Sequence, residues 1–342
     1  MGQVMTVLGP VSAESLGITL PHEHILLDLT CLWTPPENPA RAFLVDAPLS
    51  LSTRGLLACD PYHSRPNLRL DDPDLAAVEL GYFKDLGGQT VVDLSTRTIG
   101  PYPAELAAIA RRTGLHIIMG TGFYVQAAHP DWVAEASIDA LVEQMVRELQ
   151  EGFAGTPVKA GIIGEIGTRS PVHAHEEKCL RAAARAQRAT GAAINVHLAI
   201  FGQEGHRVLD ILQQEGADLS RVALSHLDER PDTAYQRSLA ERGVYLEFDC
   251  FGSECYWDQD GEREASDAER IEALLRLLDA GLERQVLLSQ DVCTRMQLRR
   301  YGGMGYDHLL RTIVPRLRRR GVDDATIRVM MVENPARLLS GD

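Results

Sequence analysis

The stretch ITLPHEHILL, residues 18–27, is the first of a series of short apolar runs and carries two histidines, His22 and His24. Side chains of a β-strand alternate between its two faces, so both imidazoles point the same way if this stretch is a strand. Two imidazoles side by side supply half of a tetrahedral metal site. The stretch therefore predicts a strand that carries metal ligands, and other parts of the chain must supply the remaining ligands.

Seven further apolar runs follow this one along the chain, and helical patterns lie between them. Most of the runs are rich in Val, Ile and Leu without polar alternation, as is typical of strands buried on both faces. The helical patterns stop at or just before a glycine, which is the usual signal for the C-terminal end of a helix. The eight runs are residues 18–27, 89–94, 116–124, 159–167, 193–198, 222–227, 244–249 and 285–291.

Eight strands that alternate with helices predict an α/β fold of the (β/α)8 barrel type (a TIM barrel). A doubly wound open sheet is the alternative. No GxGxxG pattern follows the first run, and eight strands in even succession favour closure of the sheet. We therefore expect residues 1–342 to form a single (β/α)8 barrel.

One long segment, residues 31–70, is rich in proline and lacks a periodic pattern. Loops of this length in a compact domain usually have a function. The segment follows the first strand, so in a barrel it covers the C-terminal mouth, where barrel enzymes carry their active sites. We expect it to be a lid or a pocket wall, and a surface excursion without a role is the alternative.

Charge and composition exclude several classes of partner. The chain has 342 residues and a net charge of -14, whereas nucleic-acid binding requires clustered Lys and Arg. No apolar stretch approaches the ~20 residues of a membrane helix. The six cysteines show no CxxC spacing, which favours a reducing cytosol. We therefore expect a cytoplasmic protein that acts on a small molecule and has no nucleic-acid or membrane partner.

Four of the later runs also end in a histidine or a carboxylate. The carboxyl ends of all strands in a barrel meet at one rim, so these side chains are expected to join the two histidines of the first run. Six ligands are too many for one tetrahedral zinc ion and suit two divalent ions bridged by a carboxylate, for which Glu165 is the natural choice. The six candidate ligands are His22, His24, Glu165, His197, His226 and Asp291.

Such a centre predicts hydrolysis without an organic cofactor. Two metal ions lower the pKa of a shared water, and one of them polarises the carbonyl or phosphoryl oxygen under attack. Asp291 can accept the proton of the attacking hydroxide and pass it to the leaving group, which makes it the candidate catalytic residue. Lys159 is rejected as a carboxylated ligand, because its place before Glu165 on the fourth run puts it ~20 Å away at the barrel floor.

Together these motifs resemble the phosphotriesterase-like branch of the amidohydrolase superfamily, and most closely its phosphotriesterase-related proteins. The resemblance covers nearly the whole chain. The segments that carry it are TVLGP at 6–10, HEH at 22–24, GFY at 122–124, GIIGEIG at 161–167, SHLD at 225–228 and YGGMGY at 301–306, with His197 and Asp291.

The resemblance implies a centre with two divalent metal ions, zinc being expected and manganese or cobalt the alternatives. His22, His24 and Asp291 are expected to bind the more deeply placed ion, and His197 and His226 the more exposed one. Relatives are often dimers, so a homodimer is an option for this chain.

The resemblance also points to residues that contact the substrate or orient a ligand. Tyr124 matches a tyrosine that lines the metal centre in the lactonases of this branch. Cys250 stands where the phosphotriesterases proper have His and the lactonases Arg, and a thiol is a poorer proton relay at neutral pH than imidazole; a small packing residue is the alternative for it. Arg230 is a candidate to bind an anionic end of the substrate, or else a solvated loop charge. Asp228 is a candidate to orient His226.

We expect a metal-dependent hydrolase that uses a metal-bridging hydroxide to cleave a carboxyl compound, in the first place a lactone or an ester. The most similar subgroup is also associated with cleavage of N-acyl amino acids or N-acyl taurines, so an amide is the alternative within the same mechanism. Phosphotriester hydrolysis is expected only as a weak side activity. A non-catalytic barrel is disfavoured, because decay would erase at least one ligand and the set is complete.

Overall fold

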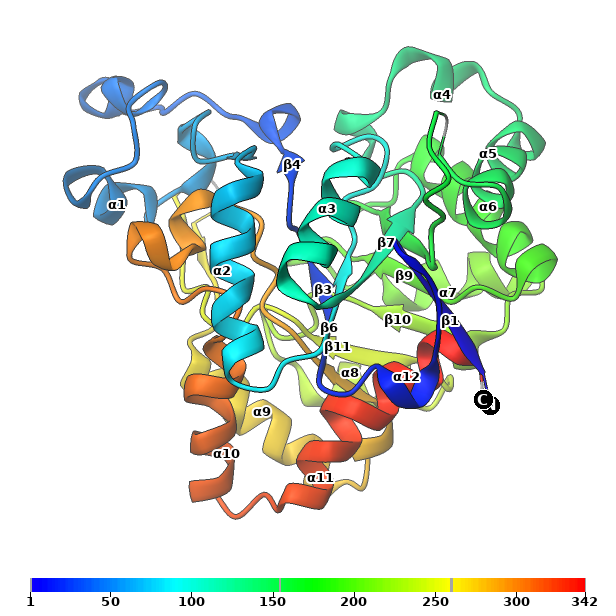
Figure 1. Cartoon of the computed structure of the whole chain (residues 1–342). Coiled ribbons are helices and arrows are strands. Elements are labelled where there is room, and N and C mark those ends of the chain that lie inside the picture. Colours follow the sequence, from blue (N-terminus) through cyan, green and yellow to red (C-terminus); the bar gives the residue numbers. More distant parts are fainter. Residues whose placement is uncertain (1, 154, 259–260, 342) are drawn as a thin grey trace.

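The computed structural model describes residues 2–153, 155–258 and 261–341 of the chain (Figure 1). Its centre is a parallel sheet of eight strands in the order β14-β11-β10-β9-β8-β7-β6-β3, so the first and last strands of the chain's alternation stand at the two ends of this order. The strands are β3 (Thr19–Glu23), β6 (Thr90–Asp93), β7 (His116–Thr121), β8 (Ile162–Gly167), β9 (Ile194–His197), β10 (Val222–Leu224), β11 (Tyr245–Phe248) and β14 (Val286–Leu288).

The hydroxyl of Ser289, just after β14, joins the two end strands of this sheet. It accepts the His22 N–H at 3.2 Å and lies 2.7 Å from the His22 carbonyl oxygen, to which it donates. The Ser289 side chain thus makes the hydrogen bonds between β14 and β3 that backbone groups make between the other strands. The sheet therefore closes into the expected barrel.

Helices surround this barrel, and the expected glycine stops are confirmed at several of their ends. Gly114 and Gly191 follow α3 and α6 in the left-handed conformation, with φ of 66° and 74°. The N-terminus of α2 has its own signal, because the Asp72 carboxylate accepts the N–H groups of the first turn. The helices are α1 (Leu51–Leu57), α2 (Pro73–Asp85), α3 (Pro103–Thr113), α4 (Asp131–Glu135), α5 (Ile138–Gln150), α6 (Ala174–Thr190), α7 (Gly205–Gln214), α8 (Thr233–Ala240), α9 (Asp267–Asp279), α10 (Val314–Arg319), α11 (Asp324–Arg328) and α12 (Asn334–Ser340).

The apolar runs in the sequence extend beyond the strands that they form. The first run, residues 18–27, contains β3 only as far as Glu23, and the run at 285–291 contains β14 only as far as Leu288. The residues that follow each strand leave the hydrogen-bond ladder and line the mouth of the barrel. Three of the candidate ligands, His24, His226 and Asp291, therefore lie just beyond the end of their strand.

Outside the barrel, short paired strands close the loops. An N-terminal hairpin packs beside β7, and the long segment 31–70 is bounded by an antiparallel pair. That segment is more ordered than its sequence indicates, because it contains α1 and several single-turn helices (Figure 1). The small strands are β1 (Gln3–Thr6), β2 (Gly9–Ser12), β4 (Leu27–Asp28), β5 (Arg69–Leu70), β12 (Tyr256–Trp257) and β13 (Glu262–Arg263).

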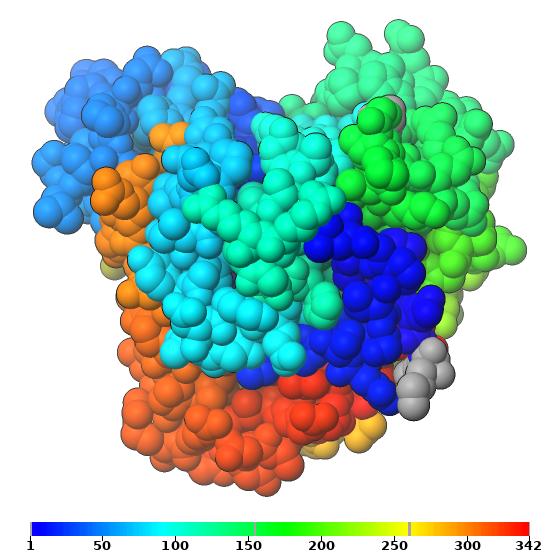
Figure 2. All heavy atoms as spheres, viewed as in Figure 1, coloured from blue at the N-terminus to red at the C-terminus, as the bar shows by residue number. Residues whose placement is uncertain are grey.

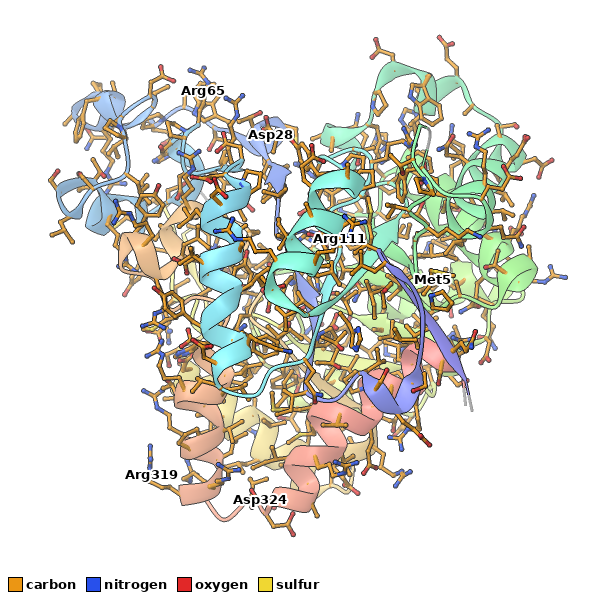
Figure 3. The ribbon with its side chains drawn as sticks, in the orientation of Figure 1. Met5, Asp28, Arg65, Arg111, Arg319 and Asp324 are labelled. Carbon is orange, nitrogen blue, oxygen red and sulfur yellow. The ribbon has the colours of Figure 1, made fainter. Side chains whose placement is uncertain are left out.

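The surface separates charged from apolar side chains in the usual way. Arg319 and Asp324 project from the helices at the lower edge of the view (Figure 3), whereas every residue of β6 and β8 is buried. The segment around α1 and the region around α4 form two projections with a hollow between them (Figure 2). Among the described residues, no helix has the length and apolar character needed to cross a membrane.

The close contact between the backbones of β7 and β8 can be tested by adding a methyl group at Gly120. A Cβ on Gly120 would lie 2.0 Å from the Gly164 carbonyl oxygen, whereas a Cβ on Gly81 within α2 would meet nothing within 4 Å. We expect Gly120→Ala to destabilise the protein by ~3 kcal/mol through overpacking. The control Gly81→Ala is expected to stabilise it by ~0.5–1 kcal/mol through helix propensity. Denaturant unfolding measures both, and equal effects would contradict the contact between β7 and β8.

Candidate metal centre and substrate cavity

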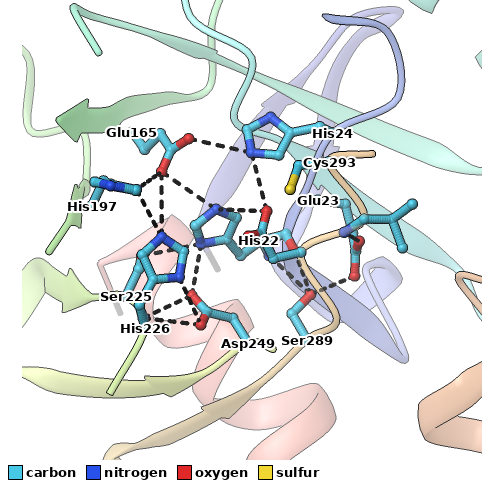
Figure 4. Close-up of polar contacts among 12 residues, drawn as sticks. His22, Glu23, His24, Glu165, His197, Ser225, His226, Asp249, Ser289 and Cys293 are labelled. Carbon is cyan, nitrogen blue, oxygen red and sulfur yellow. Dashed lines mark hydrogen bonds and ion pairs between the residues drawn. The ribbon is translucent and has the colours of Figure 1, made fainter. Parts of the chain in front are cut away.

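The C-terminal ends of five strands bring all six predicted ligands into one cluster, and Figure 4 labels five of them. Glu165 lies within β8 and His197 ends β9, while His226 and Asp291 stand two and three residues beyond β10 and β14. His22 and His24 come from β3 and the residue after it. Every one of these residues is buried except Asp291, whose side chain keeps 16% of its surface exposed.

One group of ligand atoms gathers around His24. Its Nε2 lies 3.2 Å from Glu165 Oε1 and 3.2 Å from Asp291 Oδ1. His22 Nε2 lies 3.5 Å from Glu165 Oε2 and 3.7 Å from Asp291 Oδ1. Ligand atoms of a tetrahedral zinc ion with bonds of ~2.0–2.1 Å are about 3.3 Å apart, so these separations suit one ion between the three side chains and Glu165.

A second group lies on the other side of Glu165. His197 Nδ1 is 3.1 Å from Glu165 Oε2 and 2.8 Å from His226 Nε2, so the two imidazoles turn different nitrogens toward one point. Oε1 of Glu165 thus faces His24 and Oε2 faces His197. This is the geometry expected of a carboxylate that bridges two cations.

Two buried atoms of the cluster indicate that a cation belongs there. His22 Nε2 and Asp291 Oδ1 have no hydrogen-bond partner among the described residues. An unsatisfied buried polar group costs ~1–3 kcal/mol, and a divalent ion between these atoms would satisfy both. Imidazole and carboxylate donors suit zinc and other divalent transition metals. The residues present therefore fit a metal centre.

The charge states of both carboxylates and of His197 match those of metal ligands. Against the effect of burial, nearby carboxylates raise the pKa of His24 to about 9 and that of His226 to about 10. Burial alone would raise the pKa of Glu165, but its hydrogen bond to His197 and the neighbouring imidazoles hold that pKa well below the usual value. Burial likewise opposes the ionisation of Asp291, yet the neighbouring imidazole of His24 lowers the pKa of this carboxyl group. Burial and the charge of His226 lower the pKa of His197. Ionised carboxylates and neutral imidazole are the forms that bind a metal ion.

Two ligands, His226 and Asp291, sit on a left-handed backbone with φ of 62° and 45°. Such conformations cost ~1–3 kcal/mol each in non-glycine residues and persist only where neighbouring contacts hold them. The Glu23 carboxylate holds Asp291, because Oε1 accepts the Gln290 N–H and Oε2 accepts the Val292 N–H, both at 2.9 Å. Sequence reasoning missed Glu23, although a carboxylate between two ligands on an apolar strand must be buried and needs partners.

Asp249 is a second residue that sequence reasoning missed. Its Oδ2 lies 2.9 Å from His22 Nδ1, and its Oδ1 lies 3.2 Å from His226 Nδ1 and accepts the His226 N–H at 2.9 Å. One carboxylate thus orients a ligand from each group (Figure 4). The signal was present, because Asp249 ends the seventh apolar run at the same rim as the ligands.

The predicted role of Asp228 needs correction. Asp228 accepts the backbone N–H groups of Asp249 at 3.3 Å and Cys250 at 3.1 Å, and it pairs with the fully buried Arg270 at 3.2 Å. The direct partner of His226 is Asp249, so Asp228 acts one step further away. The loop after β10 turns its carboxylate under the end of β11 instead of toward the imidazole.

The three predicted substrate residues occupy different places. Tyr124 is buried at the cluster, with its hydroxyl 3.5 Å from His197 Nδ1. Cys250 lies behind His226, where its thiol donates to Asp249 at 3.3 Å and burial raises the pKa of the thiol well above its usual value. Arg230 pairs with Glu262 at 3.4 Å in a separate surface groove, and 66% of its side chain is exposed. The structure therefore brings Tyr124 to the cluster and leaves Arg230 away from it.

A cavity of about 560 Å³ lies above the cluster and falls within the ~300–1,000 Å³ range of small-molecule sites. A smaller cavity beneath it contains His24, Glu165 and Asp291 among its walls. The segment 31–70 supplies part of the upper wall, as the pocket-wall prediction requires. Residues shared by the two cavities are Tyr62, Tyr124, His197 and Ile200.

Comparison with known proteins gives matches along the whole chain. A model of the phosphotriesterase family matches residues 2–339. The N-acetyltaurine hydrolases of Xenopus tropicalis and Homo sapiens are 37% and 35% identical to this chain, and each match covers 99% of this chain and 98% of the relative. A solved resiniferatoxin-binding protein from Rhodobacter sphaeroides superposes with a TM-score of 0.97 at 42% identity, over 99% of this chain and 95% of that one. The lactonase Lmo2620 from Listeria monocytogenes superposes with a TM-score of 0.80 at 27% identity, over 99% of both chains.

Because Asp249 contacts one histidine from each group of ligands, replacing it should weaken metal binding. Asp249→Asn removes the negative charge that orients His22 and His226, so metal affinity should fall ~10–100-fold. Competition with a chelator of known affinity measures this change. Asp279→Asn, at the exposed end of α9, is the matched control and should bind metal as the wild type does. Unchanged affinity in Asp249→Asn would show that the carboxylate does not position the ligands.

Proposed function

This chain is a hydrolase of the phosphotriesterase family, and we propose that it cleaves the amide bond of N-acyl amino acids or N-acyl aminosulfonates such as N-acetyltaurine. The observation that supports the amide is similarity over 99% of the chain to hydrolases with that substrate in their name, at 37% identity in one case. A lactone or ester, which the sequence alone favours, becomes the second candidate because the lactonase neighbour is 27% identical.

We assign the metal centre to two divalent ions, zinc in the first place and manganese or cobalt as alternatives. His22, His24 and Asp291 would hold one ion and His197 and His226 the other, with the two oxygens of Glu165 directed at both groups. Bound metal ions supply an activated water and polarise a carbonyl oxygen.

Asp291 is suited to move the proton that amide cleavage requires. An amine leaves only after its nitrogen is protonated, so a general acid must stand beside the scissile bond. Asp291 is the ligand whose side chain is 16% exposed, and it borders the small cavity below the substrate space. Its carboxylate accepts a proton from the attacking water and delivers it to the amide nitrogen.

Tyr124 and the aromatic walls position the substrate. Burial raises the pKa of the Tyr124 phenol well above its usual value, so the hydroxyl stays protonated and can donate to a substrate oxygen. Tyr62 and Trp257 stack edge to face at 4.7 Å on the wall of the cavity. They provide an apolar surface for the acyl group and keep bulk water from the scissile bond.

A substrate panel tests the proposal. With metal-loaded protein, we expect kcat/KM to be highest for N-acyl taurines or N-acyl amino acids, lower for lactones, and lowest by orders of magnitude for paraoxon. A lactone that turns over faster than every amide would make the second candidate the function.

The ligand variants test which residues carry this turnover. Asp291→Asn and His22→Ala should each lower kcat by ~10²–10⁴ or more, because they remove the proton carrier or a metal ligand. Circular dichroism should show the folded barrel in both variants. Turnover close to that of the wild type in either variant would contradict the assigned role.

Removal of the metal gives an independent prediction. Dialysis against a chelator should abolish turnover and lower Tm, since an ion that binds only the folded state stabilises it. Zinc, manganese or cobalt should restore both, and elemental analysis should find two ions per chain. Lys159→Ala is the control, because Lys159 precedes the first residue of β8 and should leave the metal content unchanged. Fewer than one ion per chain under metal-replete conditions would contradict the two-ion assignment.

A further inference from the structure

The chain segment that leaves β8 is pinned beside the metal cluster. Thr168 donates its N–H and its hydroxyl to the His197 carbonyl oxygen, at 3.0 Å and 2.7 Å. The next N–H, that of Arg169, is accepted by Glu176 of α6 at 2.9 Å. The backbone of Arg169 is therefore fixed relative to a metal ligand, although its side chain is exposed.

Arg169 is the sole arginine or lysine among the described residues that line the 560 Å³ cavity. Its guanidinium has no hydrogen-bond or ion-pair partner within the described part of the chain. The two carboxylates that also line this cavity are already engaged, because Asp60 is buried and pairs with His63 at 3.4 Å and Glu262 pairs with Arg230. Neither of these carboxylates therefore neutralises Arg169.

A positive charge in this cavity would attract an anionic substrate that the rest of the protein repels. The protein has a net charge of -14, so its average field repels anions. A guanidinium binds carboxylate or sulfonate oxygens with two parallel hydrogen bonds, which the point charge of a lysine ammonium cannot match. His197 and Tyr124 border the same cavity, so a small molecule can place its carbonyl over the cluster and its anionic end at Arg169.

We propose that Arg169 binds the anionic end of the substrate, a carboxylate or sulfonate on the leaving side of the scissile amide. The reaction in this assignment rests on the proposed function, whereas the anion site rests on the residues that line the cavity. It moves the anion-binding role from Arg230 to a residue four positions after the bridging Glu165. Arg169 selects substrates by charge and takes no part in proton transfer.

A matched pair of amides tests the assignment in the full metal-loaded chain. N-acetyltaurine carries a sulfonate, and N-acetylethanolamine carries a neutral hydroxyl on a chain of the same length. Arg169→Ala should raise KM for N-acetyltaurine at least ~10-fold, with kcat and the KM for the neutral amide unchanged, because a charge-assisted hydrogen bond is lost. Arg169→Lys should recover part of the loss, and Arg169→Glu should raise KM further.

Control variants separate a local effect from a general one. Arg207→Ala, on α7 and paired with Glu177 at 2.8 Å, should leave both amides unaffected. An equal change for the charged and the neutral amide in Arg169→Ala would reveal a structural role and overturn the proposal. The same would follow if Arg230→Ala, and not Arg169→Ala, changed the discrimination.

A binding measurement without turnover tests the anion site separately from the proposed amide cleavage. Calorimetry with Asp291→Asn, compared with the double variant at equal metal content by elemental analysis, should show that adding Arg169→Ala weakens binding of N-acetyltaurine at least ~10-fold. N-acetylglycine in the same experiment tells whether carboxylate or sulfonate is preferred. If the wild type cleaves no amide, the proposed function fails, yet an Arg169-dependent affinity still supports the anion site. Equal affinities with and without Arg169 would refute it.

Discussion

The carboxylate of Glu165 lies between two groups of imidazoles, and the surrounding structure keeps those groups within reach of its two oxygens. His24 lies 3.2 Å from one oxygen and His197 lies 3.1 Å from the other. Such a cluster of buried ionisable groups is unfavourable unless each group has a partner, because charges are costly to remove from water. The barrel provides these partners from the ends of neighbouring strands, where side chains converge.

Two buried carboxylates next to the cluster hold its ligands in position. Asp249 orients one imidazole from each group, while Glu23 holds the backbone on both sides of Asp291. Behind Asp249, the buried Arg270 pairs with Asp228 and supports the end of β11. These contacts hold the left-handed backbone at His226 and Asp291 in place, so the strain at the site is maintained by hydrogen bonds from several strands.

The metal cluster and the substrate cavity depend on different parts of the chain. Strand ends supply the candidate ligands, whereas loops after β3, β7, β8, β9 and β11 supply the walls of the cavity. Proteins similar to this chain include ones named as lactonases and as N-acetyltaurine hydrolases, as expected where one fold carries sites of different specificity. In the proposed mechanism, the residues at the strand ends activate water, and the loops select among amide, lactone and phosphotriester.

The amino-acid sequence by itself determined the barrel and the six candidate ligands that meet at its mouth, because strand periodicity and the position of a residue at a strand end are local properties of the chain. His22 and His24 could be placed on one face from their spacing alone. Only the tertiary structure decided that Asp249 rather than Asp228 orients His226, that Glu23 holds Asp291, and that Arg169 rather than Arg230 enters the cavity. These outcomes depend on loop backbones whose course is set by contacts between residues far apart in the sequence, and no local pattern records such contacts.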